Sequence, residues 1–364
     1  MRIASATSRL EEFALTRPYA IAGQEPLSIV GNVIVRIETE SGLVGLGAGS
    51  PGEHVTGESL EACRAALEGG RLDWLVGRDA RTLPSLCREA ASRTAGTPAA
   101  RAAVDIALHD VLAQNLGVPL ADMLGRAHEA LPTSITIGIK PIAETLAEAD
   151  EYLGRGFRVL KVKIGDAIEQ DLERLVRLRE RVGPAVTVRV DANVGYTIEE
   201  TARFFERTAG LAIEFVEQPV PREAFDEIRT LTPRRRARIA ADESLHDEKD
   251  ALALACPEPA CGIYNIKLMK CGGVRPALRI AAIAETAGIA LMWGCMDESR
   301  VSIAAALHAA FASPATRFLD LDGSLDLARD VVSGGFTLVD GVMRTTDAPG
   351  LGVTAPTGSG NSDR

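Results

Sequence analysis

The sequence contains no uninterrupted apolar run approaching the roughly 18 residues that a membrane-spanning helix needs. Its first residues, MRIASATSRLEEF, lack the long apolar core of a secretory signal, so we expect a cytoplasmic protein. It also lacks a basic block, because 50 acidic residues outnumber 40 basic ones and leave a net charge of −10. Phosphate contacts need clustered lysine and arginine, so this balance argues against a nucleic-acid partner, and no membrane partner is indicated.

Paired cysteines are missing as well. The six cysteines are spread thinly and form no CxxC motif, so neither a zinc site nor a disulfide framework is indicated. We expect the cysteines to be free thiols that are buried like small apolar residues, in a protein from a reducing compartment. The cysteines are Cys63, Cys87, Cys256, Cys261, Cys271 and Cys295.

The chain is also long. Its 364 residues, 46% of them hydrophobic, suit two domains with a large core.

Residues 1–128 are predicted to form an α+β domain. Residues 32–49 alternate apolar and polar side chains around a turn at Ser41 and Gly42, which predicts a strand and hairpin. Residues 98–117 carry apolar side chains at helical spacing and end in glycine, which predicts a helix. Residues 47–52, GAGSPG, match a dinucleotide-binding turn, but a proline interrupts them and no βαβ unit follows. We therefore interpret them as a glycine-rich mobile loop.

From residue 129 onward, eight short β-rich runs alternate with longer helical ones. The polar residues that end the last seven runs lie 25 to 28 residues apart, which leaves room for one strand, one helix and two loops. This period predicts a modified TIM-type barrel, (β/α)8 in its (β/α)7β form, over residues 129–327, rather than an open sheet. Residues 328–356 are expected to pack back on the first domain as short strands, and 357–364 to be a disordered tail.

Three carboxylates end consecutive strands of this predicted barrel. Asp191, Glu217 and Asp242 would end the third, fourth and fifth strands, at the edge where barrel active sites lie. Carboxylates that converge raise one another's pKa unless a cation lies between them. Oxygen ligands without cysteine or histidine favour one Mg²⁺, with Mn²⁺ as the alternative. Three unrelated loop acids would not follow such a regular repeat.

Lysines form a second predicted cluster. Lys161 and Lys163 share one face of the second strand, and Lys267 ends the sixth, which lies diametrically opposite in a barrel of eight. An ammonium group that points inward from an apolar strand is costly unless it is used. We therefore expect Lys163 and Lys267 to approach a substrate from opposite faces, one neutral and the other protonated.

Asp320 and Asp322 share one face of the eighth strand, across the site from the metal carboxylates. They are predicted to hold a cationic group of the substrate, although a hydrogen-bonded strand end would use the same residues. A substrate carboxylate on the metal would then place an α-carbon between the two lysines. Removing its proton gives an enediolate that the metal stabilises, and returning the proton to the other face is epimerisation.

The runs KVKIG, VDAN, EQP, ADES, NIKLMKCGG and GCMDES, in this order and spacing, resemble the enolase superfamily in its muconate-lactonizing-enzyme branch. Enzymes of that superfamily are known to use a lysine or histidine base with Mg²⁺. The DLDG turn resembles the dipeptide epimerases of the branch. The resemblance implies an isomerase whose partner is a small dipeptide, and we expect a homo-oligomer.

The resemblance also implies a role for each site residue. Asp191, Glu217 and Asp242 would be the metal ligands, and Lys163 and Lys267 would be the acid and base. Lys161 would be an auxiliary substrate-binding residue. Asp320 and Asp322 would bind the α-ammonium group of the substrate. Capping-domain loops near residues 17–26 and 47–57 would close over the substrate side chain.

Two other classes would use much of the same site. A muconate cycloisomerase or an o-succinylbenzoate synthase type of lyase needs the metal and only one base, but its anionic substrate offers no ammonium group to Asp320 and Asp322. A non-catalytic metal-binding barrel would have no use for lysines on both sides of the site. The sequence therefore favours the epimerase.

Side-chain specificity is predicted from acidic residues on the rim. An L-Ala-D/L-Glu epimerase, the other alternative, is expected to place a cation near the capping loop, where this chain has Gln24 and Glu25. Glu53 on the second loop and Asp297 after the seventh strand add further acids, unless Asp297 only caps the next helix and Glu53 only faces solvent. Such a pocket attracts cations. We predict a preference for Lys or Arg at the epimerised position, with hydrophobic dipeptides second.

Overall fold

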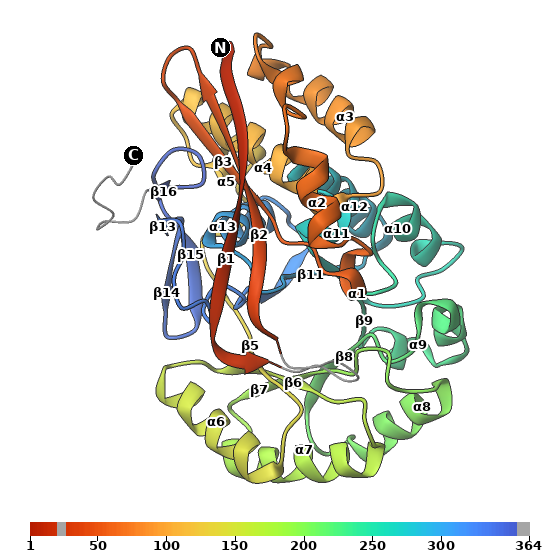
Figure 1. The fold of residues 1–364 in the computed structure, drawn as a ribbon. Helices are drawn as coiled ribbons and strands as arrows, with labels where there is room; N and C mark the ends of the chain where they lie inside the picture. The colour runs from red at the N-terminus through yellow and green to blue at the C-terminus, as the bar shows by residue number, and fades with distance from the viewer. Residues whose placement is uncertain (20–26, 355–364) are drawn as a thin grey trace.

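The computed structural model describes residues 1–19 and 27–354 of the chain. The first part is a three-stranded antiparallel sheet in the order β1-β2-β3, covered by helices (Figure 1). Its strands are β1 (Ile3–Tyr19), β2 (Leu27–Thr39) and β3 (Val44–Gly49). The helices are α1 (Glu53–Thr56), α2 (Leu60–Leu67), α3 (Leu83–Arg93), α4 (Pro98–Leu116) and α5 (Leu120–Leu124), with 3₁₀ turns at Asp73–Leu75 and Ala80–Thr82.

The predicted hairpin and helix of this part are both present. Strands β2 and β3 pair from Val33 opposite Gly49 to Glu38 opposite Val44. Helix α4 is followed by Gly117, whose φ of 71° is a left-handed conformation that favours glycine at the end of a helix. The long strand β1, which pairs with β2 along most of its length, was not predicted.

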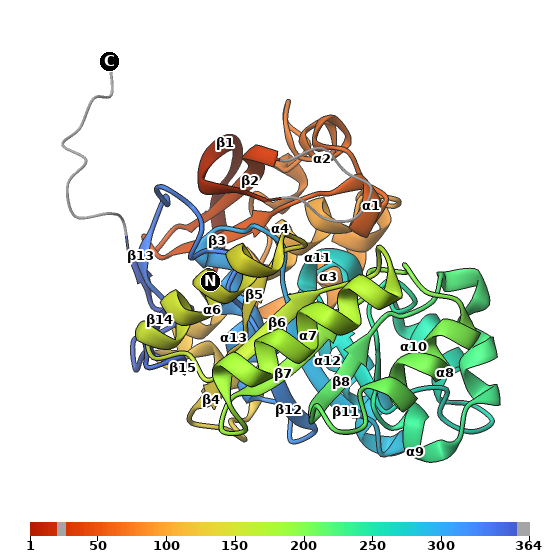
Figure 2. The same cartoon turned by 90° about the horizontal axis from the view of Figure 1, so that it is seen from below.

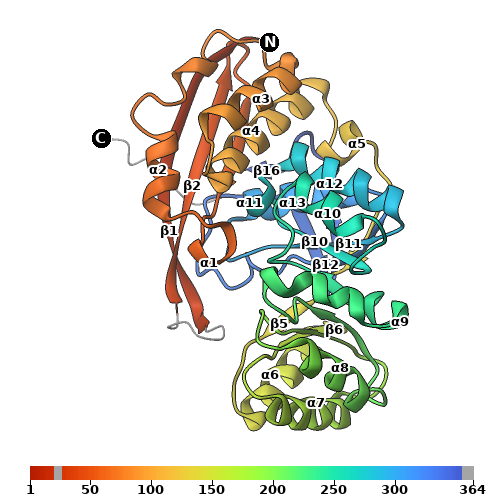
Figure 3. The same ribbon diagram turned by 90° about the vertical axis from the view of Figure 1, so that its right-hand side faces the viewer.

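The glycine-rich run is not a mobile loop at its start, which corrects the interpretation of residues 47–52. Gly45, Gly47 and Gly49 lie in β3, which contacts helix α4. Figure 3 shows α4 running along the sheet that contains β1 and β2. A Cβ atom on these glycines would lie 2.3, 1.8 and 2.5 Å, respectively, from backbone carbonyl oxygens of the helix. The glycines therefore let the backbones of the strand and the helix approach closely. In the sequence, glycines with this role look the same as the glycines of a turn.

The second part is a parallel eight-stranded barrel in the order β12-β11-β10-β9-β8-β7-β6-β5. It closes where Thr133 bridges Leu319 and the amide of Ser134 donates to the Leu319 carbonyl at 3.1 Å. The strands are β5 (Ile135–Ile137), β6 (Val159–Lys163), β7 (Thr187–Asp191), β8 (Ile213–Glu217), β9 (Ile239–Ala241), β10 (Ile263–Ile266), β11 (Ala290–Gly294) and β12 (Thr316–Asp320).

Helices follow the first seven barrel strands and cover the outside of the barrel, as α6, α7 and α8 do in Figure 2. After β12 the chain passes into a turn, so the predicted (β/α)7β barrel with an α+β capping part is confirmed. The helical segments are α6 (Ile142–Gly154), α7 (Ile168–Val182), α8 (Ile198–Arg207), the 3₁₀ helix η3 (Arg222–Thr230), α9 (Pro233–Arg236), α10 (Glu248–Ala255), α11 (Leu268–Cys271), α12 (Val274–Ala287) and α13 (Arg300–Phe311).

The last described residues form two small sheets that touch both parts. Strand β13 (Ser333–Gly334) pairs with β16 (Val353–Thr354), and β14 (Phe336–Val339) and β15 (Val342–Thr345) join β4 (Leu131–Pro132). Farther along, the amide of Leu351 donates to Asp110 of α4 at 2.8 Å. The domain limits at residues 128, 327 and 356 stay predictions, and the predicted tail 357–364 lies outside the described residues.

A layer of aromatic rings and one arginine fills the barrel at a level below the site. The guanidinium carbon of Arg189 lies 5.3 Å from the ring centre of Phe215 and 4.9 Å from that of Phe318. Its Nε donates to Glu214 at 2.7 Å and its Nη1 to the Leu319 carbonyl at 2.9 Å. Arg189 is 3% exposed, so this layer separates the inner charges of the site from solvent at the amino ends of the strands.

Within residues 1–19 and 27–354, no helix is long and apolar enough to cross a membrane. All six cysteines are free thiols, and Cys63, Cys87, Cys261 and Cys271 are buried. Cys256 is exposed, and Cys295 lies partly buried at the end of β11.

We predict that Gly47→Ala lowers the free energy of unfolding by about 3 kcal/mol, because the added methyl group would collide with the Ala103 carbonyl and force strand and helix apart. Urea unfolding measures this loss. The matched control is Gly210→Ala, where nothing lies within 4 Å of the added atom. We expect it to change stability by less than about 1 kcal/mol. Equal stability of the two variants would contradict the close packing of β3 on α4.

Candidate active site

The three predicted carboxylates meet at the carboxyl ends of adjacent strands. Asp191 ends β7 and Glu217 ends β8, and the two residues are paired in register. Asp242 follows β9, which pairs with β8. All three are at most 1% exposed. The structure therefore brings these residues together as the sequence predicts.

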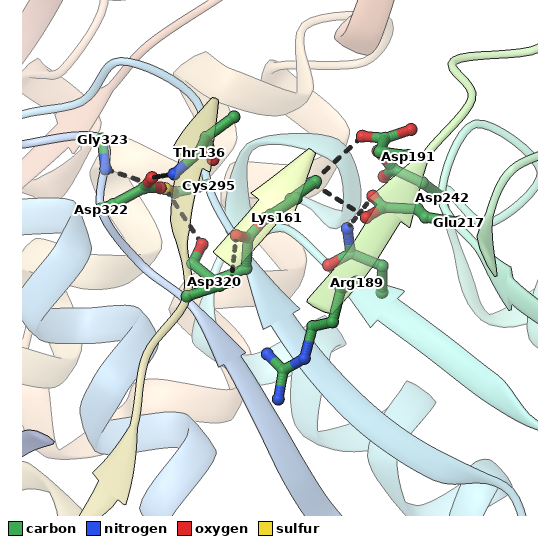
Figure 4. A network of polar contacts seen from close by, with 12 residues as sticks. Thr136, Lys161, Arg189, Asp191, Glu217, Asp242, Cys295, Asp320, Asp322 and Gly323 are labelled. Carbon is green, nitrogen blue, oxygen red and sulfur yellow. Dashed lines mark hydrogen bonds and ion pairs between the residues drawn. The ribbon is translucent and has the colours of Figure 1, made fainter. Parts of the chain in front are cut away.

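Lys161 lies at the centre of this cluster (Figure 4). Its Nζ lies 3.1 Å from Asp191 Oδ2, 2.9 Å from Glu217 Oε2 and 2.8 Å from Asp320 Oδ2. Burial lowers the pKa of Lys161, but the three carboxylates raise it by more, so the net shift is well upward. Lys161 is therefore a fixed cation that joins the two acidic groups of the site.

Lys163 and Lys267 lie on β6 and just after β10, strands that are four apart in the barrel. Lys163 Nζ donates to Asp191 Oδ2 at 2.6 Å and to Asn193 Oδ1 at 2.9 Å. Lys267 Nζ donates to Asp242 Oδ2 at 2.7 Å. Both side chains line the same cavity, from the opposite sides that the sequence predicts.

Asp320 and Asp322 also line the cavity, but their surroundings differ. Asp320 Oδ1 accepts from Ser134 Oγ at 2.6 Å, and its other oxygen accepts from Lys161. Asp322 Oδ2 accepts from the Thr136 amide at 2.8 Å and has no lysine partner among the described residues (Figure 4). Burial, and then the charge of Asp320, raises the pKa of Asp322 to about 7. Of the two, Asp320 is thus the one that is paired directly with Lys161, whose charge acts on Asp322 only from farther away.

Two residues of the inner site were missed by the sequence analysis. Lys270, on the short helix α11, is 3% exposed, and its Nζ donates to the carboxylate and the backbone carbonyl of Asp242. Glu243 follows Asp242 and accepts from Asn193 Nδ2 at 3.2 Å. The only signal in the sequence was position, since Lys270 lies one helical turn after Lys267 and Glu243 directly follows a predicted ligand.

The inner carboxylates have the chemistry that a divalent cation requires. Glu243 Oε2 is buried with no hydrogen-bond partner in the described part of the chain, and Glu217 Oε2 has only its ion pair with Lys161. Burial, and then Asp191, raises the pKa of Glu217 to about 8. Burial, and then Asp242, raises that of Glu243 to about 7. The carboxylates of Glu217 and Glu243 therefore carry more negative charge than the nearby lysines balance. A hard cation that prefers oxygen ligands fits between these carboxylates.

A cavity of about 430 Å³ lies above these groups, between the capping part and the barrel. Glu53 and Asp297, both predicted for the site, line it, and so does Asp326, which was not predicted. Burial, and then Asp326, raises the pKa of Asp297 to about 6 against the charge of Lys163. Gln24 lies outside the described residues. The cavity wall is therefore acidic where a substrate side chain would lie.

Asp297 does not cap the helix that follows it. The N-cap of α13 is Ser299, whose Oγ accepts from the Val301 amide at 3.3 Å. Asp330 accepts from the Arg300 amide at 2.7 Å at the same helix start. The capping alternative for Asp297 is therefore wrong, and its carboxylate remains on the cavity wall.

Two known domain families match the chain. Residues 7–125 match the mandelate racemase / muconate lactonizing enzyme N-terminal domain, and residues 144–357 match the enolase C-terminal domain-like family. The chain therefore belongs to the enolase superfamily, in its mandelate racemase and muconate lactonizing enzyme group.

Within that group the chain is a member of the dipeptide epimerases, which are isomerases. The L-Lys-D/L-Arg epimerase of Methylococcus capsulatus is 62% identical to it over 98% of this chain and 100% of its own. The L-Lys-D/L-Arg epimerase of Desulforapulum autotrophicum is 56% identical over 97% and 99%. The L-Ala-D/L-Glu epimerase of Bacillus subtilis is 36% identical over 95% of both chains. The family and enzyme class predicted from the sequence are confirmed.

Solved structures agree with this assignment. The crystal structure of the dipeptide epimerase from Methylococcus capsulatus complexed with Mg and the dipeptide L-Arg-D-Lys has a TM-score of 0.95 at 62% identity, and covers 97% of this chain and 99% of that one. A substrate-liganded complex of the L-Ala-D/L-Glu epimerase from Bacillus subtilis has a TM-score of 0.92 at 34% identity, over 98% and 99%.

We predict that Lys270→Met lowers the free energy of unfolding by about 3 kcal/mol, because removing one partner of a buried ion pair leaves Asp242 with less compensating charge. Urea unfolding in Mg²⁺-free buffer measures the loss. Lys249→Met is the matched control, since Lys249 is exposed on α10, and we expect a change of at most about 0.5 kcal/mol. A Lys270→Met protein as stable as the control would show that this ammonium group does not support Asp242.

Proposed function

We propose that the chain is a Mg²⁺-dependent dipeptide epimerase that favours dipeptides with cationic side chains. One observation carries the proposal: Lys163 and Lys267 enter a single cavity from opposite sides, beneath a wall that bears Glu53, Asp297 and Asp326. The relatives at 62% and 56% identity are both L-Lys-D/L-Arg epimerases, which supports the same substrate class.

The substrate is oriented by charge at its amino end. Asp322 forms no ion pair within the described residues and receives the α-ammonium group of the dipeptide, which restores its ionised form. Asp320 is held by Lys161 and Ser134, so it adds negative charge without moving. The dipeptide is thereby fixed with its carboxylate toward Asp191, Glu217 and Asp242.

Those three carboxylates are the proposed ligands of Mg²⁺. When bound, the ion supplies positive charge that stabilises the negative charge developing on the substrate carboxylate and lowers the pKa of nearby ammonium groups. Lys161 holds Asp191 and Glu217, and Lys270 holds Asp242, so the ligands are oriented before the ion arrives.

The proton transfer itself belongs to the two opposed lysines. One of Lys163 and Lys267, in its neutral form, removes the α-proton, and the other, in its protonated form, gives a proton to the opposite face of the same carbon. In the structure each donates to a carboxylate, Lys163 to Asp191 and Lys267 to Asp242, which fixes the ammonium group on its own side. Such an arrangement inverts one stereocentre.

Side-chain preference follows from the acids of the wall. The charge of Asp326 adds to burial in raising the pKa of Asp297, so a cationic side chain placed near the two carboxylates relieves their repulsion. An acidic side chain would meet the same repulsion, which disfavours an L-Ala-D/L-Glu epimerase. An anionic substrate of a cycloisomerase or lyase would also meet Asp322 without an ammonium group. The lysines on both sides argue against a non-catalytic barrel.

A cytoplasmic location and a homo-oligomeric assembly stay predictions, as does the absence of nucleic-acid and membrane partners. The side-chain preference is proposed for the epimerised position, with hydrophobic dipeptides second.

The proposed reaction is tested by incubating L-Lys-L-Arg with the protein and Mg²⁺ in deuterated water. We expect deuterium at the α-carbon of the arginine, followed by net epimerisation, both abolished by exhaustive chelation and restored by Mg²⁺. Mass spectrometry and NMR follow the two events. Full turnover after chelation, or no exchange with any cationic dipeptide, would contradict the proposal.

We predict that Lys163→Ala and Lys267→Ala each reduce net epimerisation by about 10³-fold or more, because each removes the proposed acid or base on its face. Either variant can still exchange the α-proton of one epimer, and the two variants should differ in which one. Deuterium exchange measured separately on the L,L and L,D dipeptides tests this. Normal turnover by either variant would rule out two opposed bases.

We predict that kcat/KM for L-Lys-L-Arg falls as the pH drops through about 6, because Asp297 then takes up a proton and its attraction for the cationic side chain is lost. The dipeptide L-Ala-L-Leu should lack this step, while a step near pH 7 from Asp322 should affect both substrates. Asp297→Asn should make the pH profiles of the two dipeptides alike. At pH 8 it should also lower kcat/KM for the cationic substrate about tenfold, which corresponds to the loss of about 1.4 kcal/mol of attraction. Unchanged pH profiles in the variant would refute the role of Asp297.

A further inference from the structure

The short helix α1 forms part of the cavity wall. Glu53, His54 and Val55 all line the cavity. The turn is closed by Thr56, whose Oγ accepts from the Gly52 amide at 3.1 Å and donates to the Gly52 carbonyl at 3.0 Å. Glycines flank it on both sides, and Gly57 has a φ of 68°. The segment 52–57 is thus a compact turn between two glycines.

The flanking residues are anchored, Ser50 to Met269 and Asp297 of the barrel and Glu58 to α4, and a histidine of the barrel holds the turn between them. His246, in the loop after β9, contacts the Val55 carbonyl through Nε2 at 3.1 Å. Across residues 1–19 and 27–354, no other hydrogen bond or ion pair joins residues 52–57 to the barrel, although α1 also packs on α11. His246 does not line the cavity, so it acts on the wall from behind.

The protonation of His246 is fixed by its other neighbours. Arg222 Nη1 contacts His246 Nδ1, and a guanidinium group can only donate, so Nδ1 accepts and Nε2 carries the proton. Arg222 also donates to Asp250 Oδ1 at 2.7 Å, and Asp250 Oδ2 accepts from the His246 amide at 2.8 Å. Residues of η3 and α10 therefore hold the imidazole as a donor toward Val55.

We propose that His246 is a positioning residue for substrate binding: by donating to the Val55 carbonyl it fixes helix α1 against the barrel and holds Glu53 on the cavity wall. The inference rests on the proposed function only in taking this cavity as the dipeptide site. Burial, and then the charges of Lys270 and Arg222, lowers the pKa of His246, opposed by the Val55 carbonyl and Asp250, which keeps the imidazole neutral at pH 7.

The test compares His246→Gln, which retains a side-chain donor and an acceptor, with His246→Leu, which retains neither. The matched control is His128→Leu, because His128 Nε2 makes a similar contact at 3.0 Å with the carbonyl of Ser313, which unlike Val55 does not line the cavity. We expect His246→Leu to raise KM for L-Lys-L-Arg about tenfold with kcat within about twofold, and His246→Gln to recover most of the loss. His128→Leu should leave KM unchanged.

Hydrogen–deuterium exchange of the amides in residues 52–57, measured without substrate, is the second readout. Exchange should be faster in His246→Leu and near the wild-type rate in His246→Gln and His128→Leu. Arg222→Met changes an exposed residue and removes the donor to His246 Nδ1, so the imidazole is no longer held with its proton on Nε2. This variant should raise both the exchange rate and KM about threefold, and it tests the proposal even if His246→Leu fails to fold.

Wild-type exchange and KM in both His246→Leu and Arg222→Met would overturn the proposal. A wild-type protein that does not act on cationic dipeptides would instead refute the proposed function, and the exchange rates would still decide whether His246 holds α1.

Discussion

The site depends on one buried ion cluster, in which Lys161 lies between Asp191, Glu217 and Asp320. These groups come from an arc of the barrel formed by β12, β5, β6, β7 and β8. Below them Arg189 and Phe215 are buried, and Arg189 lies between the rings of Phe215 and Phe318. Charges interact strongly where water is absent, so the cluster must stay close to electrical balance. The proposed ligands above the cluster, a divalent cation and the ammonium group of a dipeptide, bring the positive charge that completes this electrical balance.

Much of the barrel could be predicted from the sequence because its signals are local. A strand that is followed by a helix repeats every 25 to 28 residues, and the polar residue at each strand end identifies the active edge. The capping part is less regular. Gly47 was interpreted as part of a mobile loop because its reason for being glycine is Ala103, which lies 56 residues away on α4. Contacts between segments so far apart leave no periodic pattern.

The same distinction separates the site residues that were predicted from those that were missed. Asp297 could be proposed because it follows a recognisable strand. Lys270 could not, because the turn of α11 decides whether its side chain points outward or toward Asp242. Asp326 could not either, because its position depends on the pairing of Leu327 with Leu15 of β1. The position of Asp326 is thus set by the way the capping part meets the barrel.

Around residue 326 that meeting is made by the main chain, which has a consequence for how such enzymes diverge. The Thr16 amide donates to the Asp326 carbonyl at 2.7 Å, and the Ala328 amide donates to the Ala14 carbonyl at 2.8 Å. Backbone contacts do not depend on side-chain identity, so a different residue at position 326 would leave the loop in place. Evolution can therefore change the chemistry of this wall one substitution at a time, without having to rebuild the junction that carries it.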